Sequence, residues 1–319
     1  MRIAVLGAAG VRKTETSISR AARSLGHDCT LINAVGLSRY LGPLSGRVAR
    51  YLTDAFQPDF ILVTRHAIEL GESLLRQLFR GRASAFWYFD FEPKDKVIRL
   101  GRLVDKMYVT YFGQLQVYRS AGVADVGFLP QGVDPFQDTP AEHAPPDFQC
   151  DTSFVGSGQP SHRYDVLRAV AAVSRLQIRG PGWDRAPADL PVAGGPVHGK
   201  RLAQVIRGAA ISLGASSLPG QDDERFSASN RMWKILGCGG FYLGRHVHGI
   251  ESFAVHAQHC AWYRDPQHAA ELVRHYLSDP EERERIARAG RAHALAAHTY
   301  AHRLELLLSG KTYPLPTIL

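Results

Sequence analysis

The stretch that decides the fold opens the chain, where Arg2-Ile3-Ala4-Val5-Leu6-Gly7-Ala8-Ala9-Gly10 precedes an amphipathic segment and a second apolar run. Residues 3–7 are apolar and run into glycines, which is typical of a strand that enters a tight turn. Between residues 16 and 25 apolar side chains recur at helical spacing, and residues 29–32 are apolar again. Strand, glycine turn, helix and strand predict a βαβ unit that starts a parallel sheet.

The same alternation continues along the chain and breaks once. Further strands are predicted over 60–64, 85–89, 106–110 and 126–129, with helices over 70–79 and 113–120. Residues 134–146 hold four prolines and no periodicity, so they predict a linker. A second series follows, with strands predicted over 152–155, 176–179, 210–213 and 241–243 and helices over 163–174, 200–207, 230–236, 269–276 and 280–296. The sequence therefore predicts two doubly wound α/β halves.

Composition limits the class of protein. The chain has 319 residues, of which 45% are hydrophobic and 21% charged, so it is not a disordered chain. The net charge of +8 suits a polyanionic ligand such as a nucleotide diphosphate, a nucleic acid or an anionic membrane surface. Cys29, Cys150, Cys238 and Cys260 form no CxxC pair, which predicts reduced, structural thiols and a cytoplasmic protein. No run approaches the ~20 apolar residues of a membrane-spanning helix, so a soluble chain is expected.

Two glycine turns follow predicted strands. Residues 7–14 lack the glycine before lysine that a phosphate loop needs, because Arg12 stands there, and they also lack GxGxxG. A tight turn explains these glycines, and the alternative is a turn that places Gly10 and Arg12 near a ligand. Gly156-Ser157-Gly158 precedes Arg163 at the start of the next predicted helix, where backbone N–H groups can attract an anion. A simple turn remains the other interpretation.

A basic helix start gives the more informative signal. Ser229 or Asn230 is a good N-cap, and Arg231 and Lys234 follow within the first turn. Two cations oppose the helix dipole there, which favours an anion. We therefore expect a diphosphate site, with a solvated basic face as the alternative. Glu251 follows a later strand, where it could accept hydrogen bonds from sugar or ribose hydroxyls or serve as an N-terminal helix charge. The nearby histidines show no carboxylate pattern for a metal, so no metal site is expected.

These segments together resemble the CgeB-like glycosyltransferases, a family named for a spore-maturation protein. The resemblance covers residues 150–305 well and the first half only in outline, and it rests on Asp151–Ser157, Gly182-Trp183, Asn230–Phe241, Gly249–Phe253, Tyr263–Asp265, His298–Tyr300 and Arg303. It implies the GT-B fold, an α/β fold of two facing Rossmann-like domains with parallel sheets and a cleft between them. The implied domains are an acceptor domain over 1–145, a nucleotide-sugar donor domain over 146–304 and a tail over 305–319 that crosses back to the first.

The resemblance also implies a function and a donor site. The expected activity is that of a metal-independent glycosyltransferase that moves a sugar from a nucleotide diphosphate sugar to an acceptor, without a cofactor. Carried over by position, Ser229, Asn230 and Arg231 would flank the diphosphate. Gly156, Ser157 and Arg163 would line the cleft wall, and Gly182, Trp183 and the turn with His198 would lie near the base. Cationic side chains and helix N–H groups would replace a metal in stabilising the leaving diphosphate.

Two residues qualify this expectation. Lys234 stands where the family usually has an acidic residue that would hold the ribose hydroxyls, and an ammonium group can only donate hydrogen bonds. Either the donor sits differently or activity is impaired. If the reaction inverts the anomeric centre, it needs a general base, for which Asp90 at the end of a predicted strand is the candidate. A structural acceptor or cap is the alternative role for Asp90.

Two other classes of function stay open on the sequence. Lys234 motivates a non-catalytic protein that binds a sugar nucleotide or a partner. The charge of +8 motivates a transferase that acts on nucleic acid, although the sequence lacks a basic stripe interleaved with aromatic residues. The donor sugar, the acceptor and the oligomeric state are not specified by any motif.

Overall fold

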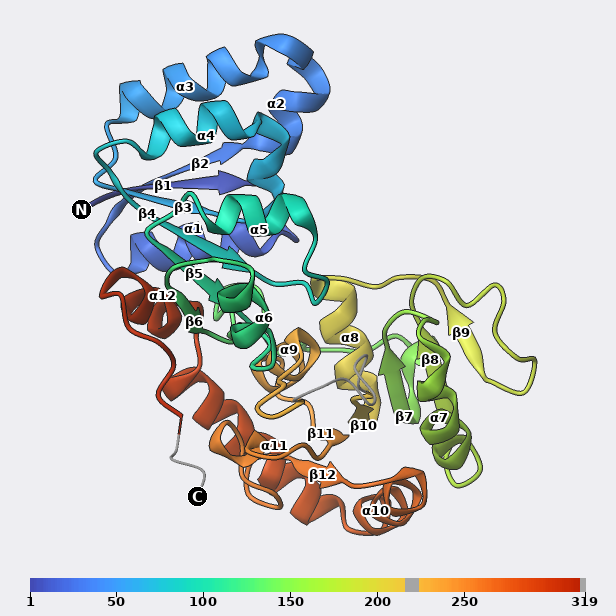
Figure 1. Ribbon diagram of the computed structural model, residues 1–319. Helices are drawn as coiled ribbons and strands as arrows, with labels where there is room; N and C mark the ends of the chain where they lie inside the picture. Colours follow the sequence, from blue (N-terminus) through green and yellow to red (C-terminus); the bar gives the residue numbers. More distant parts are fainter. Residues whose placement is uncertain (216–223, 316–319) are drawn as a thin grey trace. The chain divides into compact units, whose positions relative to one another are not determined.

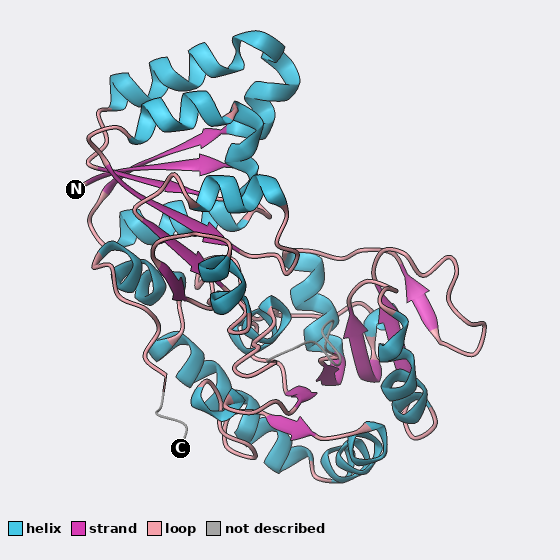
Figure 2. Ribbon diagram, viewed as in Figure 1, coloured by secondary structure: helices cyan, strands magenta, loops and turns pink. Residues whose placement is uncertain are grey.

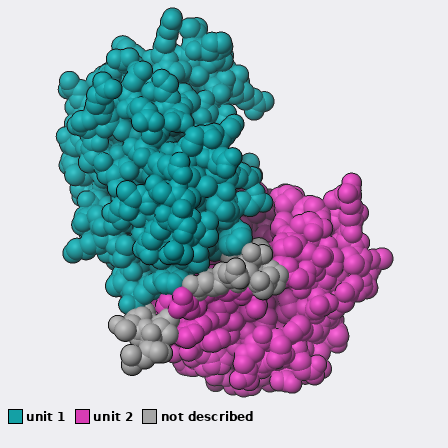
Figure 3. Space-filling view, viewed as in Figure 1, with its two compact units in different colours: residues 1–131, 300–315 teal, residues 132–299, 316–319 magenta. Residues whose placement is uncertain are grey.

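The computed structural model describes residues 1–215 and 224–315. The chain divides into two compact units, the first made of residues 1–131 and 300–315 and the second of residues 132–299 (Figure 3). Each unit holds a parallel sheet of six strands within these described residues, with helices packed on its faces (Figures 1 and 2). The predicted fold class, two Rossmann-like α/β halves, is confirmed.

The sheet of the first unit has the order β2-β1-β3-β4-β5-β6. Its strands are β1 (Arg2–Gly7), β2 (Asp28–Asn33), β3 (Phe60–Val63), β4 (Ala83–Tyr88), β5 (Lys106–Val109) and β6 (Val126–Phe128). Its helices are α1 (Thr14–Ser24), α2 (Ala34–Leu41), α3 (Ser45–Phe56), α4 (Glu72–Phe79), α5 (Asp95–Gly101), α6 (Gln114–Ser120) and α12 (Tyr300–Leu308), with short 3-10 turns η1 (Gly42–Leu44) and η2 (Arg65–Leu70). Strand β2 pairs with one edge of β1, and β3, which follows later in the chain, pairs with the other edge. The carboxyl ends of β1 and β3 therefore form the topological switch point at which such sheets bind ligands.

Alternation along the strands divides the core of this unit into two layers. Ile3 and Val5 face α1 and α12, whereas Ala4 and Leu6 face the opposite layer. Buried side chains on both faces explain why β1 reads as a continuous apolar run. Leu304, on α12, is fully buried in the first of these layers.

The C-terminal segment belongs to the first unit from Tyr300 onward, earlier than the residue 305 at which the sequence placed its tail. The hydroxyl of Tyr108 donates to the carbonyl of Leu307 at 3.2 Å, and the amide of Tyr313 donates to the carbonyl of Phe128 at 2.9 Å. The expected tail residues 316–319 lie outside the described residues. The buried guanidinium of Arg303 donates to the carbonyl of Pro130 at 3.1 Å, so the two segments that leave this unit are held together.

The sheet of the second unit has the order β12-β11-β10-β7-β8-β9. Its strands are β7 (Cys150–Val155), β8 (Leu176–Arg179), β9 (Val192–Gly194), β10 (Ala209–Leu213), β11 (Tyr242–Arg245) and β12 (Ala261–Tyr263). Its helices are α7 (Tyr164–Ala171), α8 (Lys200–Gly208), α9 (Asn230–Gly237), α10 (Pro266–Ser278) and α11 (Pro280–Ala297), with 3-10 turns η3 (Pro146–Phe148), η4 (Ser161–Arg163) and η5 (Ile250–Ser252). Here the switch point lies between β7 and β10.

The segment expected as a linker is folded. Asp134 and Asp138 are buried, and a carboxylate oxygen of Asp138 accepts from the amide of Asp134 at 3.0 Å. This side-chain bond satisfies a backbone amide in a segment whose four prolines prevent a regular helix or strand. Among the described residues, none of the helices combines the length and apolarity that crossing a membrane would require.

Candidate functional site

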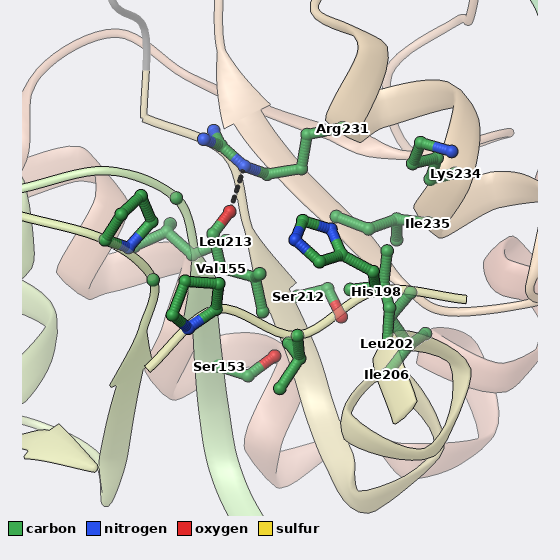
Figure 4. Close-up of a pocket in the computed structure, with 15 residues that line it drawn as sticks. Ser153, Val155, His198, Leu202, Ile206, Ser212, Leu213, Arg231, Lys234 and Ile235 are labelled. Atoms are coloured by element: carbon green, nitrogen blue, oxygen red, sulfur yellow. Dashed lines mark hydrogen bonds between the residues drawn. The ribbon is translucent and has the colours of Figure 1, made fainter. Parts of the chain in front are cut away.

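A cavity of about 220 Å³ opens at the switch point of the second unit (Figure 4). Strands β7 and β10 form its floor through Ser153, Val155, Ser212 and Leu213, and α8 and α9 form its walls. The remaining lining residues come from the β7 and β8 turns, the approach to α8, and the two helices: Gly156, Gly180, Pro181, Pro196, Val197, His198, Leu202, Ile206, Arg231, Lys234 and Ile235. The cavity therefore lies where the topology of a doubly wound sheet places a ligand.

Arg231 lies at the start of α9 and reaches across the cavity toward β7 (Figure 4). Ser229 is the N-cap of this helix, and its side chain accepts from the amide of Met232. The Nε of Arg231 donates to the carbonyl of Val155 at 2.6 Å, and an Nη donates to the carbonyl of Ala215 at 3.1 Å. These two bonds fix the guanidinium beside the carboxyl end of β7.

Arg163 places a second guanidinium beside the β7 turn. Its side chain is buried, and an Nη donates to the carbonyl of Ser157 at 2.7 Å and contacts the hydroxyl of that serine at 3.2 Å. Burial, and then the positive charge of Arg231, lower the pKa of Arg163 to about 10. The group therefore stays protonated at neutral pH.

Close backbone packing explains the glycines in the turns after β7 and β8. A methyl group on Gly158 would overlap the carbonyl of Gly182, and one on Gly180 would overlap the carbonyl of Gly156. The indole of Trp183 donates to that same Gly156 carbonyl at 2.8 Å. The turns after β7 and β8 are thus pressed together backbone to backbone. Gly182 and Trp183, expected near the base, support the site from behind and do not line the cavity.

Lys234 lies one turn further along α9 and lines the cavity. Its Nζ is 3.4 Å from a carboxylate oxygen of Asp138, and its side chain is 30% exposed. The sequence offered two roles for this residue, a phosphate ligand or a solvated surface charge. The structure adds an ion pair with Asp138 that the sequence did not predict.

The structure places His198 in the cavity and Glu251 outside it. His198 lines the cavity, as expected for a residue near the base. Glu251 lies in η5 and accepts from the amide of His256 at 3.1 Å. It lines a separate hollow with Glu224, Arg225 and Arg245, so the structure does not bring it to the cavity with Arg231.

The expected residues of the first unit lie at the carboxyl edge of its sheet. Gly10 accepts from the hydroxyl of Thr16 at 2.8 Å in the turn before α1, and Arg12 is exposed in that turn. A carboxylate oxygen of Asp90 is 2.7 Å from the Nε of Arg65. Sequence reasoning missed this partner and also a buried carboxylate, Glu15, which bonds to His66 at the same edge. Arg65 and His66 directly follow the predicted strand 60–64, and these polar residues were the sequence signal for both pairs.

Comparisons with known proteins agree with this architecture. Residues 163–309 match a family model described as glycosyl transferase-like. No curated protein sequence matches the chain. Among solved structures, the chain is similar to a sucrose-phosphate synthase from Thermosynechococcus elongatus, with a TM-score of 0.66, 14% identity, and 97% of this chain and 98% of that chain covered.

Two further structures were solved with nucleotides. HepE from Anabaena in complex with UDP-glucose gives a TM-score of 0.66 at 15% identity, covering 97% of this chain and all of that one. An α-glucosyltransferase in complex with UDP gives a TM-score of 0.71 at 11% identity, covering 97% and 99%. The chain therefore has the GT-B fold, and its residues 163–309 are similar to the glycosyl transferase-like family.

Proposed function

We propose that the chain is a glycosyltransferase that binds a nucleotide diphosphate sugar in the cavity of its second unit. The observation that carries the proposal is the guanidinium of Arg231, which lines the cavity at the switch point between β7 and β10 and donates to the carbonyl of Val155. Arg163 is buried and does not line the cavity, but it holds the turn after β7 through the carbonyl of Ser157. Beside Arg231 the N-terminus of α9 adds backbone N–H groups that favour a diphosphate. The other residues expected from the sequence around this site are Gly156, Ser157, Asn230 and Ser229.

The rest of the cavity suits the nucleoside. Apolar side chains of Val155, Val197, Leu202 and Ile235 line it and offer surfaces for a base and ribose. In this arrangement the cationic side chains and helix N–H groups stabilise the leaving diphosphate, and the reaction needs no metal.

The donor is proposed to be a uridine diphosphate sugar, because the similar structures of HepE and the α-glucosyltransferase hold UDP or UDP-glucose. The acceptor is a hydroxyl compound bound by the first unit, and the subtype is CgeB-like, as the motif string implies. An ammonium at position 234 in place of the usual carboxylate means that ribose recognition differs from that of other members of this type.

Calorimetry with UDP and UDP-glucose, with and without EDTA, tests the proposal. Arg231→Ala should weaken UDP binding at least about tenfold, since a hydrogen bond to a charged group contributes roughly 1.5–3 kcal/mol. Arg274→Ala, an exposed arginine on α10, is the matched control and should bind like the wild type. Absence of UDP binding by the wild type would refute the proposal. Binding without hydrolysis or transfer would instead identify a non-catalytic sugar-nucleotide-binding protein.

A further inference from the structure

A second cavity in the second unit lies at the amino edge of its sheet. Its volume is about 700 Å³, compared with about 220 Å³ for the cavity that Arg231 lines. Cys150 and Ala209, the first residues of β7 and β10, line it together with Phe241, which directly precedes β11. The two cavities therefore lie at opposite ends of the same strands. All the lining residues of the larger cavity belong to the second unit.

Four arginines line this larger cavity, which we call the arginine cavity. One comes from the end of α8 and three come from α11: Arg207, Arg283, Arg288 and Arg291. The carboxylates of the lining are those of Glu142 and Glu284. Burial raises the pKa of the Cys150 thiol to about 11 and that of the Cys238 thiol to about 12, so neither lining cysteine is charged at neutral pH. The lining therefore has a surplus of two positive charges.

Two of these arginines also cap helices. The Nε of Arg291 donates to the carbonyl of Gly237, at the end of α9, at 3.1 Å. An Nη of Arg283 donates to the carbonyl of Tyr276, in the last turn of α10, at 2.5 Å. Carbonyl groups at helix ends have no partner within the helix, and basic side chains commonly satisfy them. Capping is therefore a sufficient structural reason for Arg283 and Arg291.

The other two arginines, Arg207 and Arg288, have no such role. Both are exposed, and the described part of the chain gives neither side chain a hydrogen bond or an ion pair. Arg285 shows the contrast on the same helix, because it does not line the cavity and its guanidinium is 3.9 Å from the carboxylate of Glu282. Two guanidinium groups from different helices thus line one cavity without a bonding partner among the described residues.

We propose that the arginine cavity binds a small molecule that carries two or more phosphoryl groups, with Arg207 and Arg288 as its main ligands. A guanidinium presents paired N–H donors that match the oxygens of a phosphoryl group. Because the two arginines belong to α8 and α11, a ligand with several phosphoryl groups can contact both helices. The volume of about 700 Å³ lies within the range of roughly 300–1,000 Å³ that is usual for small-molecule sites. This inference does not depend on the activity proposed for the other cavity.

The lining suits a small molecule better than a nucleic acid strand. Sites for single strands combine basic residues with aromatic rings on which the bases stack. Among the described lining residues the aromatic one is Phe241, and it is only 3% exposed. The arginine cavity therefore supplies positive charge without a surface for stacking.

Calorimetry with sodium tripolyphosphate tests the inference on the wild type and on single variants. Arg207→Gln and Arg288→Gln should each weaken binding about tenfold or more, because each removes hydrogen bonds between charged groups. Both side chains are exposed, so these variants should fold normally. Arg274→Gln, at an exposed arginine of α10, is the matched control and should bind like the wild type. Glu284→Gln should bind several-fold more tightly, because it removes a lining carboxylate that repels the anion.

Arg231→Ala separates this site from the nucleotide cavity. It should keep the tripolyphosphate binding that Arg288→Gln loses, and Arg288→Gln should keep the affinity of the wild type for UDP. A wild type that binds tripolyphosphate through Arg288 but does not bind UDP would remove the proposed function and leave this inference intact.

The same titrations can overturn the inference. It fails if the wild type does not bind tripolyphosphate, if Arg231→Ala abolishes the binding while Arg207→Gln and Arg288→Gln leave it intact, or if Glu284→Gln binds no more tightly than the wild type. Citrate bound as tightly as tripolyphosphate would show a site without preference for phosphoryl groups. A single-stranded oligonucleotide bound more tightly through the same arginines would show that the ligand is a nucleic acid.

Discussion

Lys234 and Asp138 form an ion pair between segments 96 residues apart, with the Nζ of the lysine 3.4 Å from a carboxylate oxygen of the aspartate. Asp138 is buried in the proline-rich segment that follows the first unit, and Lys234 is on α9 beside the nucleotide cavity. The lysine thus fastens this segment to the helix that carries Arg231. The positive charge of Lys234 therefore stabilises the fold, in addition to any contact that it makes with a ligand.

Lys234→Met should lower the free energy of unfolding by about 1–3 kcal/mol, because it leaves the buried Asp138 carboxylate without this cation. Lys234→Glu should cost more, since it places two carboxylates together. It should also tighten uridine and weaken UDP, because a carboxylate accepts from ribose hydroxyls but repels phosphate. Urea denaturation and calorimetry with uridine and UDP measure these effects, with Arg274→Met as control. Unchanged affinity for both ligands would show that the Lys234 charge acts on Asp138 alone.

Gly156→Ala should disable the cavity by displacing Arg231. The new methyl group would overlap the guanidinium of Arg231 and crowd the ring of Phe154. We expect UDP affinity to fall about tenfold or more as the bond from Nε to Val155 is lost, and stability to fall by about 1–3 kcal/mol. Gly195→Ala is the control, because a Cβ there meets nothing within 4 Å. Equal UDP binding by the two variants would contradict this view of the turn.

Hydrophobic periodicity predicted most strands of the two sheets, but it missed β9 and β12. Buried strands such as β3 and β10 could be predicted directly from their runs of apolar residues. By contrast, β9 (Val192–Gly194) is a short edge strand with exposed residues, so it leaves no apolar pattern. Residues 34–56 form α2 and α3, for which the sequence analysis predicted nothing. These helices pack against each other as well as the sheet, and such pairing depends on tertiary contacts.

The sequence predicted those features of the candidate site that depend only on neighbouring residues. Arg231 and Ser229 belong to one helix start, and their roles as cation and cap follow from their spacing. The pairing of Glu15 with His66 joins residues 51 apart, and that of Lys234 with Asp138 joins residues 96 apart. No local pattern encodes such pairs, because the strand order that brings them together is decided by the whole sheet. The close packing of Gly156 and Gly158 was not predictable for a related reason, since their neighbours Gly180 and Gly182 lie on the turn after β8.

Leu304→Ala should destabilise the first unit. Leu304 is fully buried against α1 and the strands, so its truncation removes apolar contacts and leaves a cavity. The expected loss is about 2–5 kcal/mol in the free energy of unfolding. Leu44→Ala, at a leucine that is 53% exposed, should change stability by less than about 0.5 kcal/mol. Equal urea midpoints for the two variants would show that α12 contributes little to this core.

Glu15 should make the stability of the chain depend on pH in the acid range. Burial raises its pKa, but hydrogen bonds from His66, Thr64 and Ala8 outweigh burial and lower the pKa from 4.5 to about 2 in the folded protein, so folding favours the ionised form. A group whose pKa is lowered by folding stabilises the protein above its unfolded pKa and loses that contribution as pH falls toward its folded pKa. The wild type should therefore exceed Glu15→Gln by roughly 3 kcal/mol at pH 7, and the difference should shrink between pH 4.5 and pH 2. Urea denaturation at pH 7, 5, 4 and 3 measures it, with the exposed Glu271→Gln as control. A difference that stays constant down to pH 3 would mean that the bonds from Ala8, Thr64 and His66 do not hold Glu15 as an anion.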